Sequence, residues 1–148
     1  WVRFRDRVTG RTFYFWNTHL DHELQAARER SAELIRQRIG RLPTDSQLFL
    51  VGDFNSVAAA NRTYDILTKE AGLTDTWSAA RERRNEDANS FTGFGPLRHE
   101  GERIDWILAR GAMDVRATEV VTFRRGDQWP SDHLPVVAWI TLRQAPDQ

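Results

Sequence analysis

The chain has 148 residues, of which 40% are hydrophobic and 28% charged, and this balance predicts one globular region with a single core. Lys plus Arg and Asp plus Glu each number 21, so the formal net charge of zero gives no global electrostatic support for a nucleic-acid partner. The absence of cysteine excludes disulfides and thiolate metal sites but leaves the cellular compartment open, and no apolar run is long enough to span a membrane.

The spacing of apolar residues predicts an α/β fold with elements along the whole chain. In chain order we expect a β-hairpin of residues 1–8 and 11–18, a helix over 24–39, a buried strand over 47–51, a helix over 62–71, a mobile surface loop over 79–89, and strands over 90–94, 103–109, 115–123 and 136–142. Asp21 is the candidate N-cap of the first helix, and Gly40 is its stop.

Asp53 and Asn55 follow the buried strand over residues 47–51 directly, after a glycine that permits a sharp turn. Their side chains can both point out of the carboxyl end of the strand, where open α/β sheets place their sites. A carboxylate and a carboxamide are the oxygen ligands that a hard metal ion prefers. The alternative is an Asx-turn, in which both side chains bond to their own backbone.

Further titratable groups lie beside apolar strands: His19 after an aromatic run, Asp105 inside a strand, and Asp132 with His133 before the last strand. Taken singly, His19 could be a core histidine, Asp105 a solvent-facing acid and Asp132 a turn cap. Burying several such groups without partners is costly, so together they are expected to face one another.

The remaining histidines and one arginine are assigned separately. His22 and His99 are expected at the surface and are not site residues. Arg103, two residues before Asp105, either contacts a phosphate or braces the start of its strand, and the sequence does not distinguish these two roles.

Four segments in this order resemble the endonuclease/exonuclease/phosphatase superfamily, which includes pancreatic-type deoxyribonucleases, abasic-site endonucleases, inositol polyphosphate 5-phosphatases, neutral sphingomyelinases and deadenylases. The segments are Asn17-Thr18-His19-Leu20, Gly52-Asp53-Phe54-Asn55, Arg103-Ile104-Asp105-Trp106-Ile107-Leu108 and Ser131-Asp132-His133-Leu134-Pro135-Val136. A fifth segment, Ser90-Phe91-Thr92-Gly93-Phe94, resembles a block that many bacterial members carry before the Arg-Ile-Asp strand.

The resemblance implies a layered α/β sandwich of the deoxyribonuclease-like type and a divalent-metal-dependent phosphoesterase, and a phosphodiester is the expected substrate. It implies catalytic roles for His19, Asp53, Asn55, Asp105 and His133, substrate binding by Asn17 and Arg103, and Mg²⁺ or Mn²⁺ binding by Asp53, Asn55 and Asp132. Asp105 and His133 would form a carboxylate–imidazole dyad. Whether Asp53 or His133 is the base stays open.

Members of this superfamily begin with a long amino-terminal half that carries an early Asn and a metal-binding Glu. Residues 1–148 resemble the carboxyl-terminal portion of one such domain, so we expect an incomplete half that is inactive, or nearly so, in isolation. Two alternatives remain: a phosphomonoesterase acting on inositol-phosphate-like substrates, and a noncatalytic interaction module. The first is disfavoured because the segment around Arg103 lacks the Pro and Trp of the 5-phosphatase block.

Overall fold

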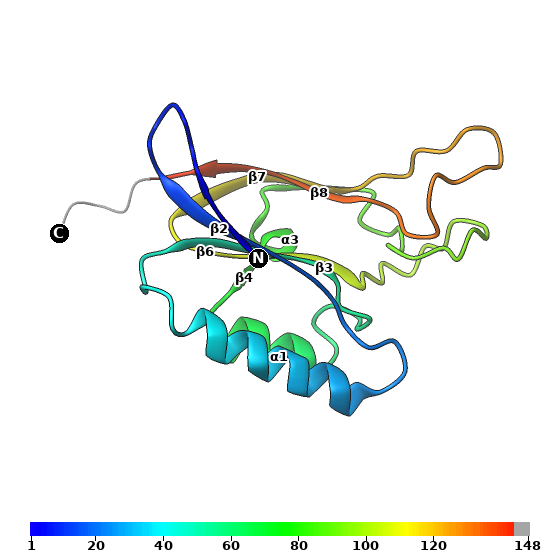
Figure 1. The fold of residues 1–148 in the computed structure, drawn as a ribbon. Helices are drawn as coiled ribbons and strands as arrows, with labels where there is room; N and C mark the ends of the chain where they lie inside the picture. Colours follow the sequence, from blue (N-terminus) through cyan, green and yellow to red (C-terminus); the bar gives the residue numbers. More distant parts are fainter. Residues whose placement is uncertain (144–148) are drawn as a thin grey trace.

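The computed structural model describes residues 1–143, which fold into two β-sheets with most of the helical residues packed against the larger one (Figure 1). The larger sheet has the order β1-β2-β3-β6-β4, with bounds β1 (Val2–Arg5), β2 (Thr12–His19), β3 (Gln47–Asp53), β4 (Thr74–Asp75) and β6 (Asp105–Arg110). The smaller sheet has the order β5-β7-β8, with bounds β5 (Glu82–Arg84), β7 (Met113–Val120) and β8 (Val136–Leu142). The helices are α1 (Gln25–Ile39), α2 (Arg62–Asp65), its π-helical continuation η1 (Ile66–Glu70), and α3 (Thr76–Ala79).

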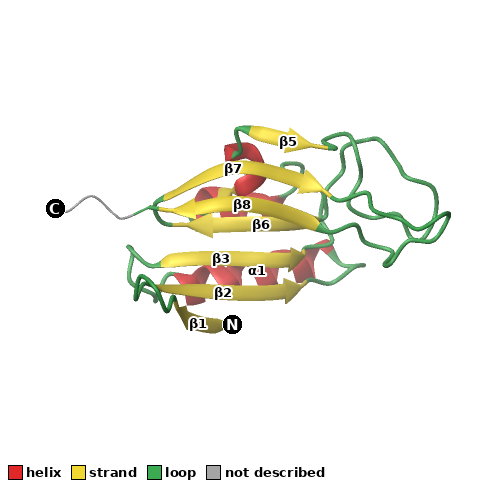
Figure 2. Ribbon diagram, turned by 90° about the horizontal axis from the view of Figure 1, so that it is seen from above, coloured by secondary structure: helices red, strands yellow, loops and turns green. Residues whose placement is uncertain are grey.

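The centre of the larger sheet combines a parallel and an antiparallel strand pair. β2 runs parallel to β3, and β3 runs antiparallel to β6 (Figure 2). A parallel pair needs a crossover connection, which α1 provides as it passes across one face of the sheet. The end of β2, the end of β3 and the start of β6 therefore lie at the same edge of the sheet.

The hydrophobic core lies between the larger sheet and α1, α2 and η1. Alternate residues of the three central strands point toward the helices, as the two-residue period of a strand requires. The buried strand residues in this core are Trp16, Leu48, Leu50, Trp106 and Leu108. Phe54, directly after β3, stacks on Trp106 with 4.2 Å between ring centroids, and this contact fixes the backbone that follows Asp53.

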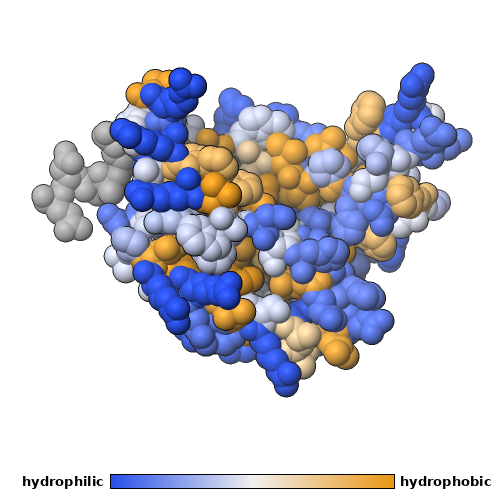
Figure 3. All heavy atoms as spheres, viewed as in Figure 1, coloured by the Kyte–Doolittle hydropathy of each residue, from blue (hydrophilic) through white to orange (hydrophobic). Residues whose placement is uncertain are grey.

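The opposite face of the larger sheet is aromatic and partly open to solvent. Phe4 stacks on Phe13, and Phe13 and Phe15 both contact Phe49. Phe4 is 46% exposed and Phe15 is 38% exposed. In the view of Figure 3, hydrophobic surface gathers between the levels of the two sheets. A contiguous exposed patch of this kind favours association.

We therefore expect the 148-residue chain to associate in a concentration-dependent way, and the double substitution Phe4→Ser with Phe15→Ser to reduce this association. Sedimentation velocity over a range of concentrations measures it. Val8→Ser is the control, since Val8 is 95% exposed in the β1–β2 turn and lies outside the aromatic cluster. If the chain stays monomeric at all concentrations, or if the double variant associates as strongly as the unmodified chain, the aromatic face is not an adhesive surface.

Most of the expected elements are confirmed, but some bounds and assignments are wrong. β1 ends at Arg5 and not at residue 8, and β7 spans Met113–Val120 and not residues 115–123. Residues 90–94 form no strand, and only Phe91 makes an isolated bridge, to His133. The expected mobile loop over 79–89 contains β5, a short charged strand that pairs with β7. β6 begins at Asp105, two residues later than expected, because the preceding backbone bonds to loops. Asp21 accepts hydrogen bonds from the turn before α1 and does not cap the helix itself.

Two elements have no counterpart among the expected ones, the two-residue strand β4 and the four-residue helix α3. Both are too short to produce a periodic apolar pattern. Within residues 1–143, the helices lack the combination of length and apolar character that crossing a bilayer requires.

Candidate active site

Three polar side chains lie level with one another across the central strands. His19 on β2 pairs in register with Asp53 on β3, and Asp53 pairs in register with Asp105 on β6. Gly52 permits this close approach of β2 and β3, because a Cβ at this position would lie only 1.9 Å from the carbonyl oxygen of Thr18. The backbone at Gly52 has a φ of +137°, which side chains rarely tolerate.

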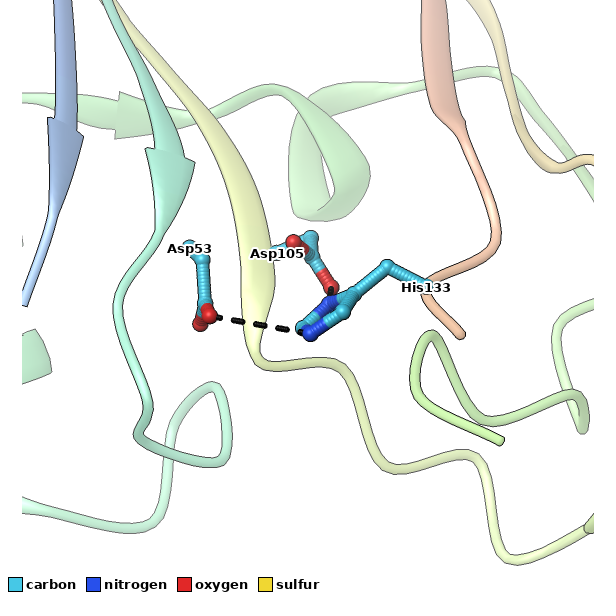
Figure 4. Close-up of side chains that lie close together, drawn as sticks. All are labelled: Asp53, Asp105 and His133. Atoms are coloured by element: carbon cyan, nitrogen blue, oxygen red, sulfur yellow. Dashed lines mark hydrogen bonds and ion pairs between the residues drawn. The ribbon is translucent and has the colours of Figure 1, made fainter. Parts of the chain in front are cut away.

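His133 reaches this row from the loop that precedes β8. Its Nδ1 lies 2.9 Å from Oδ2 of Asp105, and its Nε2 lies 3.7 Å from Oδ2 of Asp53 (Figure 4). The side chains of His133, Asp105 and Asp53 are 28%, 20% and 13% exposed. The imidazole is therefore held by a carboxylate on one nitrogen and presents its other nitrogen toward a second carboxylate.

Asp53 serves two structural roles at once. Its Oδ1 accepts a hydrogen bond from the backbone N–H of Asn55 at 2.8 Å, which is the Asx-turn that the sequence left open. Its Oδ2 lies 3.2 Å from Nε2 of His19 as well as facing His133. Asn55 adopts a left-handed φ of 47° and donates to the carbonyl of Leu20 at 2.9 Å, so it joins the ends of β2 and β3.

The electrostatics of the pair formed by Asp105 and His133 follow from burial and mutual contact. Burial raises the pKa of Asp105, and the hydrogen bond from His133 opposes that rise. Burial alone would lower the pKa of His133, but the hydrogen bond and negative charge of Asp105, with Asp53 and Asp132 adding to them, raise it above the ordinary value. The contact therefore favours a protonated imidazole at His133, whereas burial disfavours the charged form of Asp105.

Asp53, Asp105 and His133 also form a group that could hold a metal ion, with one ligand atom from each lying within 4.8 Å of the others. A hard ion such as Mg²⁺ takes oxygen ligands and retains several waters, so one or two carboxylates are a sufficient protein contribution. The donor set fits such an ion through its carboxylate oxygens. Asp132, expected as a ligand, is not part of this group.

A pocket of about 420 Å³ opens beside Asp53, Asp105 and His133. One wall is the aromatic face of the larger sheet, and the other is the segment leading into β8. The apolar residues that line it are Phe15, Val51, Trp106, Ile107, Leu134, Pro135 and Val136. The polar groups thus lie at one side of a largely apolar depression, where part of a ligand can contact the imidazole of His133 while the rest contacts the walls.

A family model described as the Endonuclease/Exonuclease/phosphatase family matches residues 1–133. The chain belongs to the endonuclease/exonuclease/phosphatase family. No curated protein matches the chain significantly.

Solved structures of the endonuclease/exonuclease/phosphatase family share the fold. A mannosyl-6-phosphatase of Bacteroides thetaiotaomicron is 29% identical, with a TM-score of 0.82, over 95% of this chain and 55% of that one. An endonuclease/exonuclease/phosphatase family protein of the same organism is 30% identical, with a TM-score of 0.79, over 93% and 54%. The human Nocturnin catalytic domain, with bound sulfate, shares the fold at 17% identity and a TM-score of 0.71, over 95% and 51%. The deoxyribonuclease-like α/β sandwich is thus confirmed, and the chain spans about half the length of these structures.

Not every residue that the family resemblance singled out lies in the central group. Asn17 is exposed on β2, two residues before His19 and therefore on the same face of the strand. The carboxylate of Asp132 lies 3.3 Å from the hydroxyl of Ser131. His22 and His99 are exposed and lie beside Glu23 and Asp87, in agreement with their expected surface positions.

Arg103 is buried behind the group and does not face the pocket. Its side chain is 7% exposed, its Nη2 donates to Oδ2 of Asp75 at 3.1 Å, and its guanidinium lies over the ring of Trp77. Of the two roles that the sequence left open, these contacts match bracing of the strand start. The substrate-binding role expected for Arg103 has no geometric support, since a buried, paired guanidinium cannot also reach a bound phosphate.

Sequence reasoning did not identify three residues that contact Arg103, Asp105 or His133 in the structure: Asp75, Ser90 and Phe91. Asp75 gave no signal, because it lies in a two-residue strand. Ser90 and Phe91 lie in the segment that resembles a bacterial family block, but no role could be assigned to them from spacing. In the structure the ring of Phe91 lies 4.9 Å from that of His133, and Ser90 contacts the start of β6.

Proposed function

We propose that the whole protein is a divalent-metal-dependent phosphoesterase, which hydrolyses a phosphodiester with water activated at the group formed by Asp53, Asp105 and His133. The observation that carries this proposal is the 2.9 Å contact between Asp105 and Nδ1 of His133, which leaves Nε2 directed toward Asp53. A phosphate ester resists hydrolysis because its anionic oxygens repel the nucleophile, so a catalyst must orient water and neutralise charge.

In this mechanism Nε2 of His133 accepts a proton from the attacking water. Asp105 holds the imidazole with its proton on Nδ1 and stabilises the imidazolium that forms. The raised pKa of His133 supports its role as the base, because His133 takes up a proton more readily than an isolated histidine. Asp53, facing the same nitrogen, orients the water and is the competing candidate for the base.

His19 and the asparagines would act on the phosphate. The side chain of His19 is 72% exposed and lies on the opposite side of Asp53 from His133. It is placed to donate a proton to the leaving oxygen or to a phosphate oxygen. We propose that Asn17, on the same strand face, contacts the phosphate, and that Asn55 keeps Asp53 in position through its hydrogen bonds.

A bound Mg²⁺ or Mn²⁺ would supply charge neutralisation of the phosphate and of the departing oxygen. Asp53 and Asp105 would contribute carboxylate oxygens to it, and Asn55 is the adjacent carboxamide. Asp132 stays a proposed ligand only through a bridging water, because it does not join the close group.

We expect hydrolysis of bis(p-nitrophenyl) phosphate by the full-length protein to require Mg²⁺ or Mn²⁺ and to disappear with excess chelator, because the proposed ligands are oxygens. Adding back Mg²⁺ should restore the rate, and adding Zn²⁺ should not restore it to the same level. Undiminished turnover in metal-free buffer with chelator would contradict the role assigned to the metal.

A phosphomonoesterase is the second candidate, supported by the likeness to the mannosyl-6-phosphatase at 29% identity. Comparing kcat/KM for bis(p-nitrophenyl) phosphate, p-nitrophenyl phosphate and mannose 6-phosphate separates the two. A preference for either monoester by tenfold or more would replace the phosphodiester proposal. Absence of turnover on all three, with Mg²⁺ present and the protein folded, would favour a noncatalytic interaction module.

A further inference from the structure

Ser90 is a fully buried serine in the loop that connects β5 to β6. It is 0% exposed, whereas its neighbour Phe91 is 41% exposed. A buried hydroxyl is costly unless it has hydrogen-bond partners, so its partners indicate what it does. The side chain of Ser90 bonds to the segment that carries Asp105, and its backbone bonds to the segment that carries His133.

The side chain of Ser90 contacts the start of β6. Its Oγ accepts the backbone N–H of Ile104 at 2.9 Å and that of Asp105 at 3.3 Å. The hydroxyl therefore fixes the backbone of Asp105, the first residue of β6, from which the carboxylate that contacts His133 projects.

The backbone of the same segment holds the loop that carries His133. The carbonyl of Ser90 accepts the N–H of Leu134 at 2.7 Å, and Phe91 pairs with His133 in an antiparallel bridge. The N–H groups of Thr92 and Gly93 donate to the carbonyl of Asp132 at 2.8 Å and 3.2 Å. The segment 90–93 therefore bonds to the residues on both sides of His133.

We infer that Ser90 is a positioning residue: its hydroxyl fixes the backbone from which the Asp105 carboxylate projects, and its carbonyl fixes the loop that carries His133, so that together they set the contact between the carboxylate and Nδ1 of His133. Without the hydroxyl, the N–H groups of Ile104 and Asp105 lose their acceptor and the start of β6 can shift relative to the imidazole. The competing interpretation is that Ser90 completes the backbone hydrogen bonding at the start of β6 without affecting the contact between Asp105 and His133. The part of the inference that concerns turnover rests on the proposed function, and the geometric part does not.

Ser90→Ala separates these two interpretations. It removes the hydroxyl but retains the backbone N–H to Glu102 and the backbone carbonyl to Leu134. Ser56→Ala is the matched control, because Ser56 is also buried and its Oγ has no hydrogen-bond partner among residues 1–143. Ser90→Cys, which is close in size and is a weak acceptor, serves as the second variant if Ser90→Ala does not fold.

The first measurement is the pair of imidazole ¹⁵N chemical shifts of His133, which report which nitrogen carries the proton. The His133→Ala variant assigns these signals. In the unmodified protein and in Ser56→Ala we expect the neutral ring to carry its proton on Nδ1. In Ser90→Ala, or in Ser90→Cys, we expect a mixture of the two tautomers. Unchanged shifts in a folded Ser90 variant would overturn the inference, and no turnover is needed to see this.

The second measurement is steady-state hydrolysis of bis(p-nitrophenyl) phosphate with Mg²⁺. Changes to residues that orient a catalytic group typically cost about 10-fold to 100-fold. We therefore expect Ser90→Ala to lower kcat in this range with KM within about twofold, and Ser56→Ala to retain the unmodified rate. A Ser90→Ala variant with a lower melting temperature but unchanged kcat would overturn the inference. If the unmodified protein has no turnover, the proposed function fails, while the ring shifts still decide the role of Ser90.

Discussion

Replacing His133 by Ala in the full-length protein is expected to lower kcat by at least about 100-fold, because general acid–base catalysis typically contributes about 10² to 10⁴ in rate. The fold should survive, since His133 is half-buried in a loop and the backbone bonds that hold this loop do not involve its ring. Initial rates with bis(p-nitrophenyl) phosphate, together with circular dichroism, measure the two properties separately.

Asp105→Asn tests whether Asp105 and His133 act as one unit. The substitution keeps the shape of the side chain but removes the charge that stabilises a protonated His133. The double variant should be little slower than His133→Ala alone, because groups that act together are not additive. If each substitution mainly lowers the melting temperature and kcat stays within a few-fold, the two residues are packing residues and the site assignment fails.

The second large effect concerns stability. Asp75→Asn is expected to lower the free energy of unfolding by about 3–5 kcal/mol, because removing one partner of a buried ion pair leaves the other charge uncompensated. The side chains of Asp75 and Arg103 are 2% and 7% exposed, and Nη1 of Arg103 is already buried without a partner within residues 1–143. Urea denaturation monitored by tryptophan fluorescence measures this loss.

The carboxylate of Asp75 also accepts from the hydroxyl of Tyr64 and from the backbone N–H of Trp77. Burial, reinforced by the charge of Asp75, raises the pKa of Tyr64 to about 12, so the phenol stays a donor at neutral pH. Asp65→Asn is the control, because Asp65 pairs with Lys69 at the surface and such pairs contribute little. Equal losses for Asp75→Asn and Asp65→Asn would show that the buried pair is not a structural support.

The strands of the core could be predicted from sequence because their apolar runs are strong. β3 and β8 were placed within two residues of their bounds, since each is an apolar run that ends at a Gly-Asp or begins after a Pro. β4 and β5 could not be predicted, because a strand of two or three polar residues has no apolar pattern of its own and forms only by pairing with a neighbouring strand. β5 forms by pairing with β7, and each paired residue of β7 lies 35 positions later in the chain, as for Glu82 and Ala117.

The composition of the candidate site was predictable, but its geometry was not. Polar residues beside apolar strands predicted that His19, Asp53, Asp105, Asp132 and His133 would face one another, and the family resemblance paired Asp105 with His133. The sequence could not give the register that sets Asp53 level with Asp105, because it depends on pairing between β3 and β6, which are distant in the chain. The same limit hid the burial of Arg103, whose partner Asp75 lies 28 residues away.

Asp105 and His133 come from different sheets, so the distance between their side chains depends on how the two sheets are packed. Asp105 opens β6 of the larger sheet, and His133 leads into β8 of the smaller one. Leu134, the residue after His133, packs in an apolar cluster with Ala88 and Val120, so a cavity cut into this cluster would let the segment that carries His133 shift partway into the space. A slip of well under 1 Å is enough to weaken a hydrogen bond of 2.9 Å. In the proposed mechanism, the rate of turnover therefore depends on this packing as well as on the residues of the site itself.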